Sequence, residues 1–424
     1  TKEEEDEYEE EDEYEDENGI TISMVSTRGN FSKCTMEVAV ELCDGTLTTA
    51  MVPPAETQTD ETWIDYWSNV VFYIKHVIRP VLLGMDPTDQ VDVDEALFRC
   101  LKRKFEDEDL NKNAGKVTFA VSAAVCKAGA LVKGESLFLH ISDLACALDA
   151  HFLPDSVVPV PVFNLTFGGS HSRNKQKQHF VFIPKGFRTL DEAIEMSKRL
   201  YCGHLEVNHG EDAIDVGGEG VYTPNIKEIK KGLNLLRSTI ASFDCTDKVF
   251  IGLDVGASIF YGSDETYRLN FKEENNEDSL KIFGDALKDV YKSLVEEYSI
   301  ALIQDAFHPN DSKHSAELTD MYDGRVLVVI EDDQLLINPV RLEREMKNNI
   351  GNALLLKMDQ MRTVTKCIDL VLRCNSYGWG VVMSSHASCD TQDTFIADIC
   401  RGLSMKRINM GAHCLTNSCT VLNR

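Results

Sequence analysis

The sequence predicts an α/β fold in which a parallel β/α barrel follows a smaller N-terminal α+β domain. Unalternated runs of Val, Ile and Leu recur in the second half of the chain, as in parallel strands buried on both faces. The polar ends of these runs lie 50, 28, 25 and 29 residues apart, close to the period of a strand–helix unit. The first 150 residues instead show strands followed by helices, which indicates an α+β domain.

Composition favours three segments: a tail (1–19), an α+β domain (20–150) and a barrel (151–424). The chain has 424 residues, 43% of them hydrophobic, which is enough for two cores. The opening TKEEEDEYEEEDEYEDEN contributes −12 of the net charge of −27, and such a block repels itself and predicts disorder. It could be a solvating tail or an acidic arm for a basic protein partner. The remaining −15 argues against a nucleic-acid partner.

Strands open the predicted α+β domain. Met36, Val38, Val40 and Leu42 alternate with other residues, the turn pair Asp44-Gly45 follows, and a second run begins at Leu47. Helical patterns then occupy 62–83, 92–105 and 117–132.

Two capping boxes predict the first helices of the barrel, Thr189 with Glu192 and Asn225 with Glu228. Five apolar runs follow, and we expect each to be a strand. Their polar ends are Asp254, Gln304 with Asp305, Asp332, Lys357 and His386.

The thirteen cysteines include no C-x-x-C pair, which predicts free thiols in a reducing compartment. No apolar run approaches the roughly 20 residues that span a bilayer, and no signal peptide opens the chain. We therefore expect a soluble, cytoplasmic protein without a membrane partner.

The carboxyl ends of barrel strands meet at one mouth, which is where a site is expected. The groups predicted there are Asp254, Gln304, Asp332, Lys357 and His386, with His171 and Glu219 from preceding loops. Carboxylates from separate strands suit Mg²⁺, and a lysine opposite them could abstract a proton next to a carboxylate. The alternative is a purely structural cluster of salt bridges, and His171 could be only a loop histidine.

A family resemblance runs through these segments. FNLTFGGSH, GGEGVYTPN, IGLDVGAS, LIQDAF, IEDDQLLINP, ALLLKMDQ, SYGWGVVMSSHAS and INMGA resemble, in order, the signature blocks of enolase (phosphopyruvate hydratase). The resemblance covers nearly the whole chain after the acidic tail. It implies the enolase fold, in which the strand and helix order at the start of the barrel is irregular.

The resemblance also implies roles. Lys357 matches the base that removes the α-proton, and Glu219 the acid that assists departure of the hydroxyl. Asp254 and Asp332 match two of three carboxylates that hold Mg²⁺. The positions that match substrate contacts are His171, Gln178, His386, Ser388 and Asn409.

Several positions depart from the pattern of the family. Gln304 stands where a third metal carboxylate is expected, and His179 where a catalytic glutamate follows Gln178. Ala387 replaces an arginine and Asn409 a lysine, while the loop that supplies a second-metal ligand reads PAETQT. Each change removes charge or reshapes a loop at the site.

These departures favour a catalytically impaired enolase-fold protein, a pseudoenzyme with a structural or binding role. The alternative is an active phosphopyruvate hydratase in which His179 exchanges protons and Asp254, Gln304 and Asp332 hold Mg²⁺. Another reaction with the same enolate chemistry is a third interpretation. The resemblance further implies a homodimer, and altered paralogues suggest an axonemal or cytoskeletal assembly in a cilium or flagellum.

Overall fold

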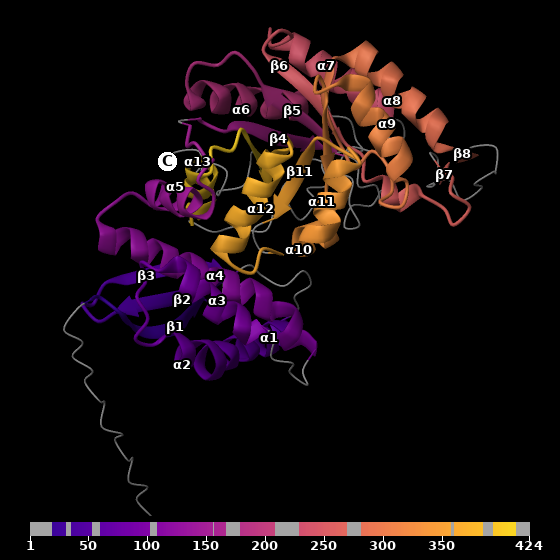
Figure 1. The fold of residues 1–424 in the computed structure, drawn as a ribbon. Helices are drawn as coiled ribbons and strands as arrows, with labels where there is room; N and C mark the ends of the chain where they lie inside the picture. Colours follow the sequence, from indigo (N-terminus) through magenta and orange to yellow (C-terminus); the bar gives the residue numbers. More distant parts are fainter. Residues whose placement is uncertain are drawn as a thin grey trace, which may run out of the picture.

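The structure, a computed structural model, confirms the predicted fold class. It describes residues 19–30, 35–52, 60–101, 108–155, 157–166, 179–207, 229–268, 281–357, 360–384 and 393–412. A small sheet with its helices lies beside a closed barrel that is surrounded by helices (Figure 1). The acidic segment 1–18 lies outside the described residues.

The N-terminal sheet is antiparallel, in the order β1 (Ile22–Asn30), β2 (Thr35–Leu42) and β3 (Leu47–Val52). The alternation of residues in β2 puts Val38 and Val40 in the core, where both are fully buried. The predicted turn is present: Gly45 has φ +83°, and the Thr46 N–H donates to Asp44 Oδ1 at 2.8 Å. Only a residue without Cβ adopts this φ at little cost.

The helices of this part are α1 (Asp60–Tyr73), a π-helical turn (Ile74–Ile78), α2 (Arg79–Leu82), α3 (Gln90–Leu101), α4 (Glu108–Lys133) and α5 (Leu137–Leu148). The sequence predicted all but α5. By length and composition, Ala114–Lys133 of α4 could cross a membrane, so the expectation that no segment is long and apolar enough was wrong. The apolar stretch of this helix is 72% buried inside the protein, as in a core helix.

Eight strands close the barrel in the order β10-β11-β12-β13-β4-β5-β6-β9. They are β4 (Val160–Thr166), β5 (His179–Pro184), β6 (Val249–Asp254), β9 (Ile300–Gln304), β10 (Leu327–Ile330), β11 (Ala353–Lys357), β12 (Gly380–Ser384) and β13 (Arg407–Ala412). All five apolar runs are therefore strands. β5 is antiparallel to both β4 and β6, which is the irregular opening that the resemblance implied.

Outside the barrel lie α6 (Leu190–Val207), α7 (Ile229–Ser242), α8 (Gly284–Tyr298), α9 (Ser312–Tyr322), α10 (Asp333–Ile337), α11 (Pro339–Lys347), α12 (Val364–Ser376) and α13 (Phe395–Gly402). A 3₁₀ turn (Ala257–Phe260) and the short strands β7 (Tyr267–Arg268) and β8 (Lys281–Ile282) form an excursion after β6. The Thr189 hydroxyl accepts the Glu192 N–H at 3.3 Å, as its capping box predicted. Asn225 and Glu228 lie outside the described residues.

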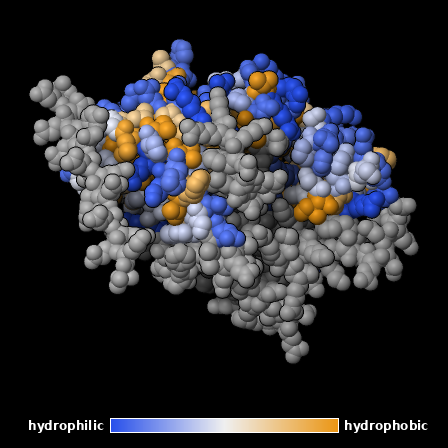
Figure 2. All heavy atoms as spheres, turned by 90° about the horizontal axis from the view of Figure 1, so that it is seen from below, coloured by the Kyte–Doolittle hydropathy of each residue, from blue (hydrophilic) through white to orange (hydrophobic). Residues whose placement is uncertain are grey.

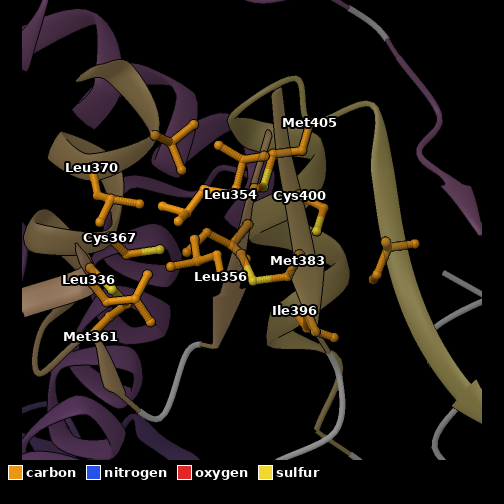
Figure 3. Packing of buried hydrophobic residues seen from close by; sticks show 14 of the residues in the cluster. Leu336, Leu354, Leu356, Met361, Cys367, Leu370, Met383, Ile396, Cys400 and Met405 are labelled. Atoms are coloured by element: carbon orange, nitrogen blue, oxygen red, sulfur yellow. The ribbon is translucent and has the colours of Figure 1, made fainter. Parts of the chain in front are cut away.

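Barrel strands bury both faces. One set of side chains fills the interior: Val162, Val181, Ile183, Leu302, Val329, Ala353, Leu355 and Val382. The alternate set points outward, so that Leu354, Leu356 and Met383 meet Cys367 of α12 and Cys400 of α13 (Figure 3). This two-sided burial explains why the strands read as unbroken apolar runs.

A buried carboxylate connects the N-terminal helices to the barrel. Asp94 of α3 accepts hydrogen bonds from Gln90 Nε2 at 2.9 Å, from the Ser122 hydroxyl of α4 and from the Thr365 N–H at 2.8 Å. The Ser122 hydroxyl also accepts the Val364 N–H at 2.9 Å. These contacts satisfy the first N–H groups of α12, which have no partner within the helix.

Candidate active site at the barrel mouth

Strand pairing places the predicted residues at one end of the barrel. Asp254, at the end of β6, pairs with Gln304 at the end of β9 and with His179 at the start of β5. Because β5 runs antiparallel, its first residue lies at the same end as the last residues of its neighbours. Lys357, at the end of β11, pairs with Ser384, and Ser384 pairs with Asn409 of β13.

Asp332 follows β10 and is held by a cation of the protein. Its Oδ2 lies 2.7 Å from Arg341 Nη2, and Arg341 is on α11. This contact is short enough for a charge-assisted hydrogen bond. A carboxylate predicted as a metal ligand therefore already has a guanidinium partner.

Glu331 is the residue at this mouth that the sequence analysis missed. Its carboxylate accepts a hydrogen bond from Gln304 Nε2 at 2.8 Å and forms an ion pair with Lys357 Nζ. It therefore bridges the ends of β9 and β11. The sequence does contain a signal for it, because Glu331 directly follows the last residue of β10 and belongs to the same acidic run as the predicted Asp332.

The backbone around Glu331 is fixed by a neighbouring acid, Asp305. Asp305 Oδ1 accepts the Glu331 N–H at 2.8 Å, and Asp305 itself has φ +48°. Burial, followed by the nearby Glu331 carboxylate, raises the pKa of Asp305 well above its ordinary value. Two hydrogen bonds from the end of β9 thus position Glu331. The Gln304 side chain contacts the Glu331 carboxylate, and the Asp305 side chain contacts the Glu331 backbone N–H.

Other predicted site residues lie outside the described residues. They are His171, Gln178, Glu219, His386 and Ser388, together with Ala387 and the PAETQT segment. For His179 the structure gives only the strand position. The described mouth is therefore the set of strand ends with Asp254, Gln304, Glu331, Asp332, Lys357 and Asn409.

The described donors do not fit the three-carboxylate magnesium site that the resemblance implies. Gln304 brings an amide in place of a charge, and its Nε2 is directed at Glu331. Arg341 contacts Asp332, and Lys357 contacts Glu331. Magnesium favours negatively charged oxygen ligands in near-octahedral geometry, and this set of side chains offers fewer of them than the family's site.

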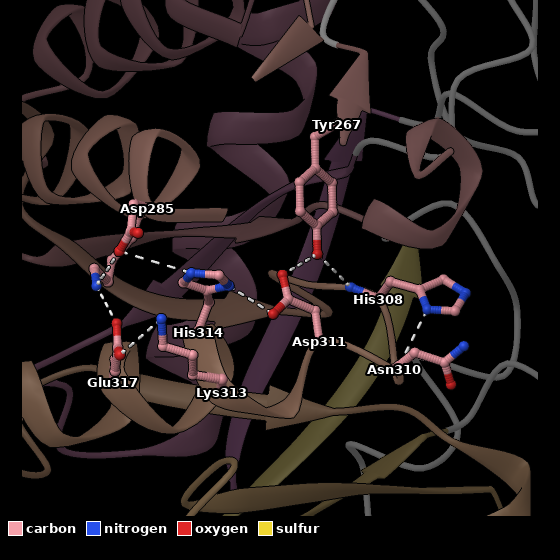
Figure 4. Close-up of polar contacts among 9 residues, drawn as sticks. Tyr267, Asp285, His308, Asn310, Asp311, Lys313, His314 and Glu317 are labelled. Carbon is pink, nitrogen blue, oxygen red and sulfur yellow. Dashed lines mark hydrogen bonds and ion pairs between the residues drawn. The ribbon is translucent and has the colours of Figure 1, made fainter. Parts of the chain in front are cut away.

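Within the described part of the chain, one group of potential ligands is close enough to share a cation: Asp285, His314 and Glu317 on α8 and α9 (Figure 4). Lys288 forms ion pairs with both of these carboxylates, and His314 Nδ1 lies 2.6 Å from Asp311 Oδ1. Tyr267 donates to the other Asp311 oxygen at 2.8 Å. The side chains already have protein partners, which identifies a structural network.

Fold and site together define the class of protein. A largely parallel barrel preceded by an α+β unit, with acids, a lysine and amides at the carboxyl ends of its strands, is the architecture of barrel enzymes that abstract protons beside carboxylates. The family model "Enolase, C-terminal TIM barrel domain" matches residues 155–424. The chain belongs to the enolase family.

Two relatives show how much of the chain the relationship covers. Enolase 2 of Hevea brasiliensis is 43% identical over 419 residues, which span 93% of this chain and 92% of the relative. Enolase of Solanum lycopersicum is 41% identical over 409 residues, which span 92% of this chain and 89% of the relative. The similarity therefore extends across the N-terminal helices and the barrel.

Proposed function

We propose that this chain is an enolase-fold protein with impaired phosphopyruvate hydratase activity and a structural or binding role. The observation that carries the proposal is the ion pair between Lys357 and Glu331. Lys357 is the position assigned to the base, and a base must present a free lone pair to the substrate. An ammonium group that is paired with a carboxylate presents none.

The change at Gln304 supports the same proposal. An amide at this strand end lacks the charge that a metal carboxylate would bring, and its hydrogen bond to Glu331 directs the NH₂ group into the mouth. Arg341 further neutralises Asp332. The protein therefore balances the charges of the mouth with its own side chains, whereas the family's chemistry relies on Mg²⁺ there.

A second candidate function is an active phosphopyruvate hydratase with rearranged groups, and Glu331 is the observation that favours it. Its carboxylate contacts Gln304, so the charge missing at the end of β9 is present one strand away. Under this proposal Glu331 acts as an anionic ligand beside Asp254 and Asp332. His179, at the start of β5, would exchange protons in place of the glutamate expected at this position.

One assay separates the two candidates. The full chain is incubated with 2-phosphoglycerate and excess Mg²⁺, and phosphoenolpyruvate formation is followed together with exchange of the α-proton with solvent. We expect neither turnover nor exchange above that of Lys357→Ala. Turnover that Lys357→Ala abolishes would contradict impairment and establish the active enzyme. Exchange without turnover would place the defect in the departure of the hydroxyl group.

Further proposals concern the cellular location, the oligomeric state and the binding partner. We propose a cytoplasmic homodimer, from the family resemblance, and an axonemal or cytoskeletal assembly as the binding role of an impaired enzyme. Sedimentation of the purified chain measures the dimer, and co-sedimentation with axonemes tests the assembly. Binding that persists in Lys357→Ala would separate the assembly from catalysis.

A further inference from the structure

An apolar groove lies where the N-terminal helices meet the barrel, between α3, α10 and α12 in Figure 1. It encloses about 180 Å³. Its apolar lining consists of Phe98, Leu335, Leu336, Ile337, Pro339, Leu342, Met361 and Leu370. Ile337 is 49% exposed, and Val340, next to the groove on α11, is 78% exposed. The surface viewed from below likewise shows separate apolar patches among hydrophilic residues (Figure 2).

The polar lining of this groove is basic although the protein is acidic. Arg362, Lys366 and Arg373 line it, with Asp369 as the single described carboxylate. Lys366, Asp369 and Arg373 lie at helical spacing on one face of α12. Arg373 Nε already lies 3.0 Å from Asp369 Oδ2, so the net positive charge of the groove comes from Arg362 and Lys366, whereas the chain without its acidic segment carries −15.

One polar atom in the groove lacks a partner. Gln360 Oε1 is buried and accepts no hydrogen bond from any described residue. A buried carbonyl oxygen without a donor is unfavourable, so a ligand that donates a hydroxyl there is favoured. The groove therefore suits a segment that combines carboxylates with an aromatic ring bearing a hydroxyl.

We propose that the chain's own acidic segment, residues 1–18, binds in this groove. The segment carries 13 acidic residues and two tyrosines, Tyr8 and Tyr14, each flanked by glutamates. A cavity of about 150 Å³ accepts a benzene ring, so a groove of about 180 Å³ has room for one tyrosine ring. The tyrosine hydroxyl donates to Gln360 Oε1, and the flanking carboxylates pair with Lys366 and Arg373.

The segment is long enough to reach the groove. Its attachment point is fixed because the Ile22 N–H donates to Met85 O at 3.0 Å. Met85 shortly precedes α3, which carries Phe98, so Phe98 lies within about 30 Å of Ile22 at 1.5 Å rise per helical residue. Eighteen extended residues reach roughly 60 Å.

Zero-length carbodiimide crosslinking of the full chain tests the proposal, because it joins carboxylates to lysines that contact them. Peptide mass spectrometry of the monomer should find Lys366 joined to residues 3–17 at least tenfold more often than Lys292. Lys292 is the matched control, an exposed lysine on α8 away from the groove. Half-molar salt should reduce the Lys366 product, since it screens surface charges.

A second variant separates docking from general charge attraction. Tyr8→Ser with Tyr14→Ser keeps every carboxylate, and we expect it to lower the Lys366 product at least fivefold while leaving thermal unfolding unchanged. An equal yield at Lys366 and Lys292, or a yield that the double variant does not alter, would overturn the proposal. So would products that occur only between molecules in a mixture of ¹⁴N- and ¹⁵N-labelled chains, which would make a second copy the occupant.

Discussion

The Glu331 carboxylate forms an ion pair with Lys357 while its second oxygen accepts a hydrogen bond from Gln304. Glu331 follows β10, so it lies between the strand ends that carry the other two residues. The negative charge expected at the end of β9 is thus present on the adjacent strand. Lys357 is bound in an ion pair by that same charge.

Moving the carboxylate from position 331 to position 304 should increase the affinity for Mg²⁺. In Gln304→Glu with Glu331→Ala, the carboxylate returns to the end of β9 and Lys357 loses its ion-pair partner, while the net charge is unchanged. We expect Mg²⁺ to bind at least tenfold more tightly than to the unmodified chain, by about 1.4 kcal/mol or more. Titration calorimetry measures this, and unchanged affinity would show that this carboxylate does not limit binding.

The buried Asp94 should make stability depend on pH. Burial raises the pKa of Asp94 above its ordinary value of 3.8, so the folded state binds the proton more tightly than the unfolded state. Its contribution to the free energy of unfolding is therefore greatest below pH 3.8 and decreases as the pH rises through the folded-state pKa. Urea unfolding between pH 3.5 and 8 should show the unmodified chain losing stability relative to Asp94→Asn.

The same carboxylate should be costly to remove. Asp94→Ala leaves the Ser122 hydroxyl and the Thr365 N–H without this acceptor, and buried donors without partners cost about 1–3 kcal/mol. Urea unfolding at pH 5 measures the loss. A loss below 0.5 kcal/mol would mean that water enters the junction between α3, α4 and α12.

Two glycines should respond oppositely to alanine. A Cβ at Gly402, the last residue of α13, would lie 2.6 Å from Phe138 O and 2.9 Å from Ile141 Cβ. We expect Gly402→Ala to destabilise the protein by about 1–3 kcal/mol, because α5 must move. Gly115 of α4 has only Arg362 Cγ within 4 Å, at 3.8 Å, so Gly115→Ala should stabilise by about 0.5–1 kcal/mol. Thermal unfolding of the pair tests this contrast.

Cysteine labelling should follow burial. The eight cysteines whose side chains the structure describes are free, as the sequence predicted; Cys43 is exposed, whereas burial raises the pKa of Cys367 and of Cys374 to about 12. At pH 8 about one such thiol in 10,000 is ionised. Iodoacetamide should therefore modify Cys43 at least 100-fold faster than either α12 cysteine. Similar rates in the folded protein would indicate that α12 opens readily.

The sequence predicted five of the eight barrel strands and did not reveal the three that complete the barrel. Five apolar runs became β6, β9, β10, β11 and β12, because two-sided burial requires continuous hydrophobicity. β4 and β13 carry polar residues such as Asn164 and Asn409, and β5 is antiparallel and follows β4 with no helix between them, so periodicity alone did not reveal these strands. The enolase resemblance supplied the irregular order that these three strands produce.

By itself, the sequence determined the fold class, the enolase family and the strand ends where the site lies, because hydrophobic period and short motifs are local properties. Which charges come into contact depends on how the strands pair. Gln304, Glu331 and Lys357 are separated by 27 and 26 residues, and they come into contact because β9, β10 and β11 pair in a fixed register. A carboxylate one position past a strand end appears in the sequence as one acid in an acidic run, and strand pairing makes it the partner of Lys357.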